Sequence, residues 1–218
     1  MRETAFIKRN AKAVVIGLSG GIDSAVVAAL CAKALGKKKV LALIMPERKD
    51  SHYRDAVALA KQLGIDYKVI DIKPIVREFD KKCRPTDKTA RANIRARTRM
   101  TLLYYYSNLL NRRVAGTGNR SEKEIGYFTK WGDGAADFFP IAHIYKTDLP
   151  AMARKLDIPE KIVRKKPSAG LWRGQTDEKE LGLSYATIDA ALKGKKKNAR
   201  VTRWKKEARH KKRMPPTL

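Results

Sequence analysis

The stretch VVIGLSGGIDSAVVAAL, Val14–Leu30, decides the fold because two apolar runs meet there at a short turn of glycine and serine. The first run, Ala13–Leu18, is rich in β-branched residues and predicts a buried strand. The second run, Asp23–Leu35, is rich in alanine, leucine and valine, and Gly36 follows it as glycine commonly follows a helix. The stretch therefore predicts a strand, a tight turn and a helix in direct succession.

The same alternation continues along the first half of the chain. Strands are expected at Lys39–Met45, Tyr67–Ile72 and Val114–Gly116, and helices at Tyr53–Leu63 and Thr89–Leu110. Strands that alternate with helices form parallel sheets covered on both faces. We therefore predict an α/β protein with a doubly wound parallel sheet and helices on both faces. Further helices are expected at Thr147–Leu156, Pro159–Lys165, Tyr185–Leu192 and Ala199–Arg209.

The turn after the first strand has the composition of an anion site. Ligands of open parallel sheets bind beyond the carboxyl ends of the strands, and Gly20 and Gly21 would let backbone N–H groups approach an anion there. Ser19 and Ser24 could donate hydrogen bonds to phosphate oxygens, whereas Asp23 would repel phosphate unless a magnesium ion lay between them. The turn is not a Walker A loop, because the pattern GxxxxGK[ST] is absent.

Composition narrows the class of protein. The chain has 218 residues, of which 43% are hydrophobic, enough for one buried core. Cys31 and Cys83 cannot form a disulfide framework and lack zinc spacing, and His52 and His143 have no partners at metal-ligand spacing. The sequence shows no secretory leader pattern and no apolar run near the roughly 20 residues that cross a bilayer. We therefore expect a cytoplasmic protein with no membrane contact.

The net charge of +27 is large for this length and predicts an anionic partner such as nucleic acid, anionic lipid or a phosphorylated small molecule. Much of the charge lies near the C-terminal end, where residues 193–218 hold 12 Lys and Arg but only one acid, Glu207. We therefore divide the chain into a main domain, residues 1–193, and a basic tail, residues 194–218. The tail could make a non-specific contact with nucleic acid.

Three sequence runs carry a resemblance to known enzymes. GLSGGIDS, Gly17–Ser24, resembles the pyrophosphate-binding PP-loop of the ATP pyrophosphatases. GTGNRSEKEIGYFTKWGDGAADFFPI, Gly116–Ile141, and KKPSAGLWRGQTDEKELGLSYATID, Lys165–Asp189, resemble the ammonia-utilising NAD synthetase family, especially its short single-domain archaeal type. The resemblance extends from about Ala13 to Arg213. It implies the adenine nucleotide alpha hydrolase-like fold.

The resemblance also implies a reaction. Deamido-NAD, ATP and ammonia would be the substrates, with Mg²⁺ as the metal cofactor. The nicotinate carboxylate would attack the α-phosphate of ATP, release pyrophosphate and form an NAD-adenylate, from which ammonia would displace AMP to give NAD. A chain of 218 residues has no room for the hydrolase domain of glutamine-dependent relatives, so free ammonia or a separate glutaminase would supply the nitrogen. Members of the family share each dinucleotide site between two subunits, which implies a homodimer.

The resemblance assigns roles to residues that match the family motifs, with Ser168 standing where many members have threonine. ATP binding is implied for Gly17, Leu18, Ser19, Gly20, Gly21, Ile22, Asp23, Ser24, Thr117, Lys146 and Ser168. Deamido-NAD binding is implied for Arg97, Lys130, Asp137, His210 and Lys211, the last two of which would let the basic tail complete the substrate site. Magnesium binding is implied for Asp23 and Glu122, and catalytic roles for Asp23, Lys130 and Asp137.

Two other functions fit parts of the sequence. A PP-loop enzyme that adenylates a tRNA base would account for the basic tail and the arginine-rich stretch Arg91–Arg113. Thiolating enzymes of that kind commonly use cysteine pairs, however, and Cys31 and Cys83 are far apart in the sequence. A non-catalytic polyanion-binding protein would account for the charge, but it predicts damage to the phosphate site, where Asp23 and Glu122 are intact.

Overall fold

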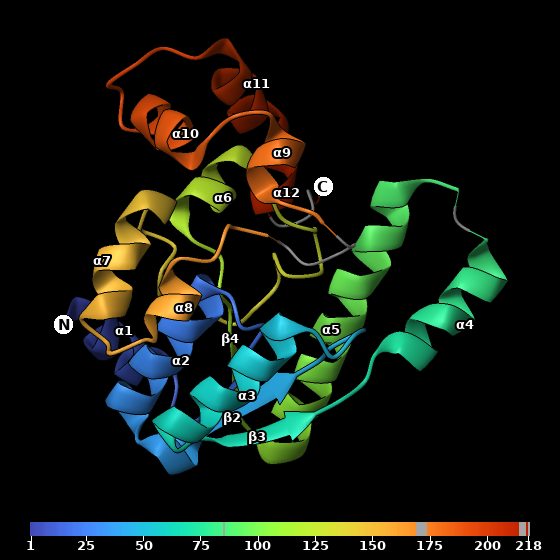
Figure 1. Ribbon diagram of the computed structural model, residues 1–218, viewed down its shortest axis with the longest axis vertical. Coiled ribbons are helices and arrows are strands. Elements are labelled where there is room, and N and C mark those ends of the chain that lie inside the picture. Colours follow the sequence, from blue (N-terminus) through green and yellow to red (C-terminus); the bar gives the residue numbers. More distant parts are fainter. Residues whose placement is uncertain (85, 169–173, 214–216, 218) are drawn as a thin grey trace.

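The computed structural model describes residues 1–84, 86–168, 174–213 and 217. Its centre is a parallel sheet of β1 (Val14–Gly17), β2 (Val40–Ile44), β3 (Asp66–Val69) and β4 (Arg113–Ala115), in the order β3-β2-β1-β4 (Figure 1). Val14 of β1 is aligned with Val40 on one side and with Arg113 on the other. The strand order changes direction between β1 and β4, which is where open sheets of this kind form a ligand crevice.

Helices cover both faces of the sheet. Side chains alternate along β1, so that Val14 and Ile16 join one hydrophobic core and Val15 joins the other. The first core is closed by α1 (Arg2–Asn10), α2 (Ile22–Leu35), α3 (Ser51–Leu63), α7 (Leu149–Arg154) and α8 (Glu160–Val163). The second core is closed by α4 (Lys73–Cys83) and α5 (Lys88–Leu110). The predicted doubly wound parallel sheet is confirmed.

A smaller helical lobe, formed by segments before and after α7 and α8 in the sequence, lies at one end of the molecule (Figure 1). It contains α6 (Arg120–Ile125), α9 (Asp177–Leu181), α10 (Tyr185–Leu192), α11 (Ala199–Glu207) and α12 (Arg209–Lys212). Ile125, Leu181, Ile188 and Val201 pack together as its core. Val201 belongs to the predicted basic tail, so this part of the tail packs against the body, while the division after residue 193 stays a prediction.

The sequence pattern places the strands and the longer helices within a few residues of their observed bounds, but it does not predict α1, α4, α6, α9 or α12. The helices α6, α9 and α12 have six, five and four residues, too few for a periodic pattern. The described residues also include the 3-10 helices η1 (Lys37–Lys39) and η2 (Lys146–Asp148), and η2 occupies the start of the helix expected from Thr147. Across the described parts of the chain, no helix is long and apolar enough to cross a membrane.

Candidate active site

A cavity of about 1270 Å³ lies between the sheet and the helical lobe. Its floor includes residues at the carboxyl ends of β1, β2 and β4, and the lobe contributes residues from α9 and α12. The residues that were assigned roles from the sequence and that line this cavity are Gly17, Leu18, Ser19, Asp23, Ser24, Arg97, Thr117, Glu122, Lys130, Lys146, Ser168, His210 and Lys211. Gly20, Gly21, Ile22 and Asp137 are not among the lining residues. The topology therefore gathers most of the expected site into one space.

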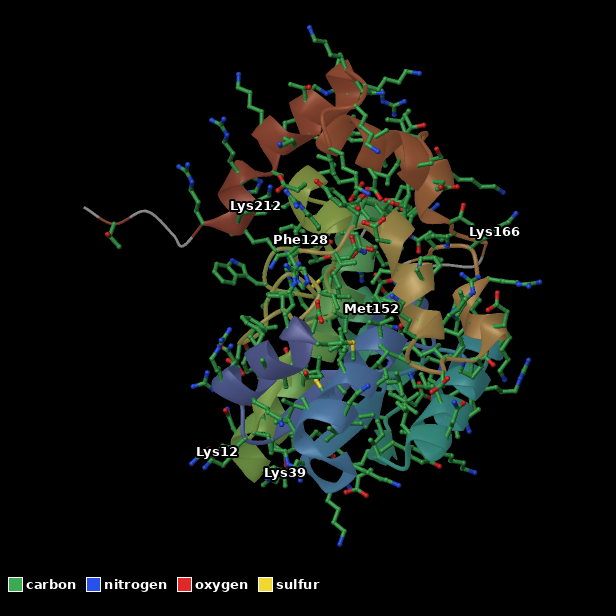
Figure 2. All side chains as sticks on the ribbon, turned by 90° about the vertical axis from the view of Figure 1, so that its left-hand side faces the viewer. Lys12, Lys39, Phe128, Met152, Lys166 and Lys212 are labelled. Atoms are coloured by element: carbon green, nitrogen blue, oxygen red, sulfur yellow. The ribbon has the colours of Figure 1, made fainter. Side chains whose placement is uncertain are left out.

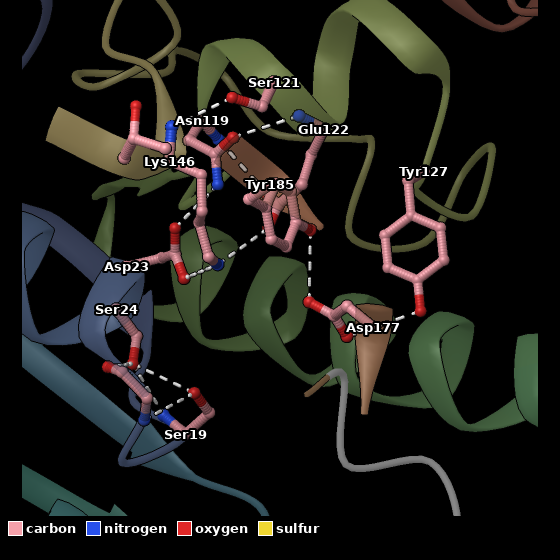
Figure 3. A network of polar contacts seen from close by, with 12 residues as sticks. Ser19, Asp23, Ser24, Asn119, Ser121, Glu122, Tyr127, Lys146, Asp177 and Tyr185 are labelled. Carbon is pink, nitrogen blue, oxygen red and sulfur yellow. Dashed lines mark hydrogen bonds and ion pairs between the residues drawn. The ribbon is translucent and has the colours of Figure 1, made fainter. Parts of the chain in front are cut away.

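The turn between β1 and α2 has a fixed shape. Gly20 adopts a φ of +78°, and a Cβ atom there would lie 2.1 Å from the carbonyl oxygen of His52, so only glycine fits. Ser24 Oγ donates to the carbonyl of Gly21 at 3.0 Å, and the N–H of Ser19 donates to Ser24 Oγ at 3.1 Å. The two serine hydroxyls are 3.0 Å apart (Figure 3). The serines therefore close the loop on itself while both still line the cavity.

Asp23 and Glu122, which are far apart in the sequence, meet at one buried ammonium group (Figure 3). Lys146 Nζ lies 2.6 Å from Asp23 Oδ2 and 3.0 Å from Glu122 Oε1. The exposed fractions of the three side chains are 6% for Lys146, 20% for Asp23 and 18% for Glu122. The structure thus brings together the two carboxylates expected to share a metal and places a cation between them.

Asn119 holds both carboxylates in place, and it was not among the expected site residues. Its side chain caps α6 by accepting from the N–H of Glu122 at 3.0 Å, and its own N–H donates to Glu122 Oε2 at 3.4 Å. Its Nδ2 donates to Asp23 Oδ1 at 2.8 Å. The sequence signal was available, because an Asn followed three residues later by Glu is a capping box.

Lys146 is positioned through its own backbone. The N–H of Lys146 donates to Ser121 Oγ at 2.9 Å, and the N–H of Thr147 donates to Asp189 Oδ2 at 3.0 Å. Ser121 Oγ in turn donates to Asp189 Oδ1. Asp189 is 2% exposed and lies on α10, so one buried carboxylate ties α6, α10 and η2 together behind the site. Sequence reasoning missed this residue because nothing local marks its partners.

The electrostatics of the cluster follow from burial and from the neighbouring charges. Burial disfavours the charge of Lys146, but Asp23 and Glu122 outweigh it and raise the pKa of Lys146 above its ordinary value. Burial raises the pKa of Glu122, with Asp23 adding to the rise and Lys146 opposing it. The cluster holds two carboxylates but one ammonium group. A further positive charge would therefore be stabilised there.

A tyrosine and carboxylate network lines the wall beside this cluster. Tyr185 lies under the Lys146 ammonium, 5.3 Å from the ring centroid, and donates its hydroxyl to Asp177 at 3.2 Å (Figure 3). Tyr127 donates to Glu180 at 2.8 Å and to Asp177 at 3.4 Å. Burial, followed by the nearby carboxylates, raises the pKa of both tyrosines, so they act as hydrogen-bond donors rather than as phenolates.

The carboxylate pair fits a hard divalent cation. In the described parts of the chain no three His, Cys, Asp or Glu side chains gather to hold a metal by themselves. Magnesium, however, is usually held by one or two carboxylates together with substrate phosphates. Asp23 and Glu122 supply such a pair beside the glycine and serine loop, and the Lys146 ammonium between them shows that the position favours positive charge.

Some of the residues expected to bind deamido-NAD line the cavity, and several of their side chains form hydrogen bonds with backbone groups. Arg97 Nη2 donates to the carbonyl of Lys130 at 3.3 Å, and Lys211 Nζ donates to two carbonyls, including that of Gly126 at 2.9 Å. Asp137 Oδ2 accepts from the N–H of Val114 at 2.6 Å, which braces the residue against β4. Arg97, Lys130, His210 and Lys211 line the cavity, whereas Asp137 is exposed and is not among the lining residues.

Comparisons with known proteins agree with this geometry. A family model described as NAD synthase matches residues 3–215. A protein of Archaeoglobus fulgidus named NH(3)-dependent NAD(+) synthetase is 50% identical over 214 residues, which covers 93% of this chain and 87% of that protein. A protein of the same name from Pyrococcus furiosus is 55% identical over 193 residues, covering 88% of this chain and 75% of that protein.

Solved structures are similar over the whole chain. An NMN synthetase from Francisella tularensis has a TM-score of 0.93 at 39% identity and is covered to 95%. An NH3-dependent NAD synthetase from Campylobacter jejuni has a TM-score of 0.80 at 36% identity and is covered to 96%. Both matches cover 100% of this chain. The expected adenine nucleotide alpha hydrolase-like fold is thereby confirmed, and the tRNA-modifying alternative gains no support. The chain belongs to the NAD synthase family of enzymes.

Proposed function

We propose that the protein uses ATP and ammonia to convert deamido-NAD to NAD, through an NAD-adenylate and with release of pyrophosphate and AMP. The observation that carries the proposal is the meeting of Asp23 and Glu122 at the Lys146 ammonium, next to the closed serine and glycine loop. ATP would lie with its phosphates at this loop, in contact with the residues assigned to it above. Ligase chemistry of this kind depends mainly on positioning and charge neutralisation.

Asp23 and Glu122 would hold Mg²⁺, which when bound would neutralise the triphosphate and the departing pyrophosphate. Lys146 balances the two carboxylates in this structure, and we propose that its ammonium pairs with phosphate oxygens when ATP is present. Ser19 and Ser24 would donate to the same phosphates. Thr117 and Ser168 line the cavity and would contact the nucleotide.

Arg97, Lys130, His210 and Lys211 would contact deamido-NAD, and Asp23, Lys130 and Asp137 are the proposed catalytic residues. One oxygen of Asp137 is already bonded to the N–H of Val114, so its proposed part would involve the other oxygen. A free carboxylate is a poor acyl donor because oxide cannot leave, whereas AMP can. The residues would therefore hold the nicotinate carboxylate against the α-phosphate and then admit ammonia to the activated carbonyl.

A second substrate is favoured by one observation, the similarity to the solved NMN synthetase at a TM-score of 0.93. Nicotinate mononucleotide carries the same carboxylate as deamido-NAD but lacks the adenylate half. The cavity of about 1270 Å³ extends from the loop to His210 and Lys211, which favours the larger dinucleotide. The ratio of kcat/KM for the two substrates decides between them, and a ratio in favour of the mononucleotide would replace our proposal.

We propose a homodimer, cytoplasmic localisation and supply of nitrogen by free ammonia or a separate glutaminase. An apolar patch supports the dimer: Tyr105, Leu109 and Trp131 are 58%, 62% and 54% exposed. A groove beside Tyr105 and Trp131 reaches Met100, which also lines the main cavity, so a second copy seated there would border the active site. Light scattering of the wild type and of Leu109→Glu tests this assignment, since the variant should be monomeric.

The direct test is reconstitution from purified protein, deamido-NAD, ATP, Mg²⁺ and ammonium, with NAD and AMP measured together. Asp23→Asn and Glu122→Gln should each lower kcat by about 10² or more, as loss of a preorganised electrostatic group commonly does. Asp66→Asn, at an exposed position on β3, is the matched control and should keep full activity. Equal AMP and NAD formation is expected, and turnover without AMP would contradict the adenylate.

A further inference from the structure

Basic side chains project into solvent along the C-terminal helices (Figure 2). We define the tail face as the exposed cations of this segment whose side chains have neither an ion pair nor a hydrogen bond within the described residues: Lys195, Lys196, Lys197, Lys206, Arg209 and Arg213. The neighbouring cations are engaged, since Lys193 pairs with Asp148 and Lys212 with Glu124. The tail face therefore carries uncompensated charge on one segment of the chain.

The tail face lies on and beside packed helices: Lys206 lies on α11 and Arg209 on α12, whereas Lys195, Lys196 and Lys197 lie in the loop before α11 and Arg213 follows α12. Val201 and Ala208 are 2% and 3% exposed and anchor α11 to the lobe, while Lys211 Nζ donates to the carbonyls of Gly126 and Phe128 at 2.9 Å. A segment anchored in this way loses less conformational entropy on binding a polyanion than a loose tail would.

Several arginine side chains of the other basic segment, on α5, already bind groups within the chain. Arg91 pairs with Asp80 at 2.5 Å, and Arg95 pairs with Glu47 at 2.6 Å. Arg99 Nε donates to the carbonyl of Met45 at 3.1 Å. The stretch Arg91–Arg113 is therefore a weak candidate for an external anion, although its composition pointed to one.

We propose that the tail face binds the phosphate backbone of double-helical nucleic acid without regard to base sequence, as an activity separate from the catalytic cavity. Phosphates complement its charge, and backbone contacts by Lys and Arg are independent of sequence. Within the described residues, the large apolar side chains that are exposed all lie before residue 185, so the tail face has no anchor for a lipid bilayer. Trp204, the one Phe, Tyr or Trp in residues 193–218, is half-buried and has Arg200 over its ring at 5.2 Å, which leaves little of it for the bases of a single strand to stack on.

The test is fluorescence anisotropy of the full chain with a labelled 24-base-pair DNA duplex over a series of KCl concentrations. If four to six cations contact phosphates, log K should fall against log salt with a slope of about −3.6 to −5.4. The variant Lys195→Gln/Lys196→Gln/Lys197→Gln/Lys206→Gln should reduce the magnitude of that slope by about 3.6 if all four make contacts. The matched control, Lys8→Gln/Arg9→Gln/Lys12→Gln/Lys33→Gln, removes the same charge from exposed positions on α1, just after it and on α2.

The proposal stands if the tail variant loses affinity and slope while the control keeps both, with the thermal midpoint and NAD synthesis unchanged in the two variants. Equal losses in both variants would overturn it, because net charge alone would then explain binding. Tighter binding of a 48-nucleotide single strand, or of phosphatidylglycerol vesicles, than of the duplex at the same salt would overturn it as well.

Discussion

Lys165 offers the sharpest test of how the segment after α8 controls the loop between β1 and α2. Its Nζ lies 2.6 Å from Asp55 Oδ2 and donates to the carbonyl of Gly20 at 3.1 Å. Lys161, four residues earlier, pairs with the same carboxylate at 2.8 Å, and among the described residues it makes no hydrogen bond to the loop. Lys165 is 18% exposed and Lys161 is 58% exposed. The two lysines therefore share one carboxylate and differ in the contact with Gly20 and in their exposure.

Replacing Lys165 by Met removes one charge-assisted hydrogen bond and one shielded ion pair, while Asp55 keeps Lys161. Hydrogen bonds to charged groups contribute about 1.5–3 kcal/mol. Each kcal/mol corresponds to about 2–4 °C for a chain of this length, so Tm should fall by about 3–12 °C. The exposed pair of Lys161 contributes about 1 kcal/mol or less, so Lys161→Met should lower Tm by no more than about 4 °C.

The effect on substrates separates positioning from general stability. If about half of the lost energy holds the loop ready for phosphate, ATP must supply about 0.8–1.5 kcal/mol, and KM for ATP should rise about 3- to 12-fold. KM for deamido-NAD should change by no more than about twofold. A change of that size corresponds to less than about 0.5 kcal/mol. Burial, followed by the charge of Lys165, lowers the pKa of His52, so this pKa should rise in Lys165→Met when followed by proton NMR.

The assay is steady-state kinetics with each substrate varied in turn, on wild type, Lys165→Met and Lys161→Met. The reasoning is refuted if both variants raise KM for ATP equally, since contact with Gly20 would then be irrelevant. It is also refuted if KM for ATP and for deamido-NAD rise together in Lys165→Met, because that pattern indicates general loosening. Lys165→Arg should recover part of the ATP affinity.

Three other predictions concern the site and its surroundings. Lys146→Met removes the ammonium that a metal must displace, so Mn²⁺ binding without ATP, followed by electron paramagnetic resonance, should tighten at least tenfold, about 1.4 kcal/mol; unchanged binding would contradict the shared cation position. Gly20→Ala should abolish ATP binding in calorimetry because its Cβ meets a backbone carbonyl at 2.1 Å, whereas Gly21→Ala, with its nearest atom at 3.4 Å, should be tolerated. Burial, followed by Lys212, lowers the pKa of Lys123 to about 8, so the folded state binds fewer protons than the unfolded state between pH 8 and about 10.5 and its stability rises with pH in that window. Urea unfolding should show a smaller rise in Lys123→Met, and an equal rise would refute the assignment.

The parts of the fold that could be predicted are those in which burial leaves a local pattern. The run at Val14–Gly17 is apolar because β1 lies between two other strands and under helices on both faces, and the same holds for β2. The helix α4 buries only Val76, so its apolar face is too narrow for the sequence pattern to predict the helix. The short helices of the lobe are stabilised mainly by packing against the rest of the protein. A local sequence pattern does not reveal such packing.

The candidate site could be predicted where one residue type is required by chemistry. Asp23 beside a phosphate loop needs a cation, and Glu122 lies in a run that resembles a known family. Asn119 could have been found from its capping box. Asp189 could not, because its role depends on Ser121, 68 residues earlier, and on a backbone N–H of η2. Contacts of that separation become visible only once the lobe is folded.

The lobe, rather than the sheet, sets the distance between the two carboxylates. Asp23 is fixed by α2 at the end of β1, but Glu122 depends on the cap of α6, and Lys146 depends on Ser121 and on the Asp189 contact behind it. Asp189 is held by α10, whose Ile188 is fully buried in the lobe core with Val201 of α11. The basic tail therefore has a structural part in the candidate active site, because α11 supports α10, whose Asp189 holds Ser121 and the backbone of Thr147 behind Lys146. Charge on its outer surface and packing on its inner surface are separate properties, so the outer surface can change while the carboxylate geometry is retained.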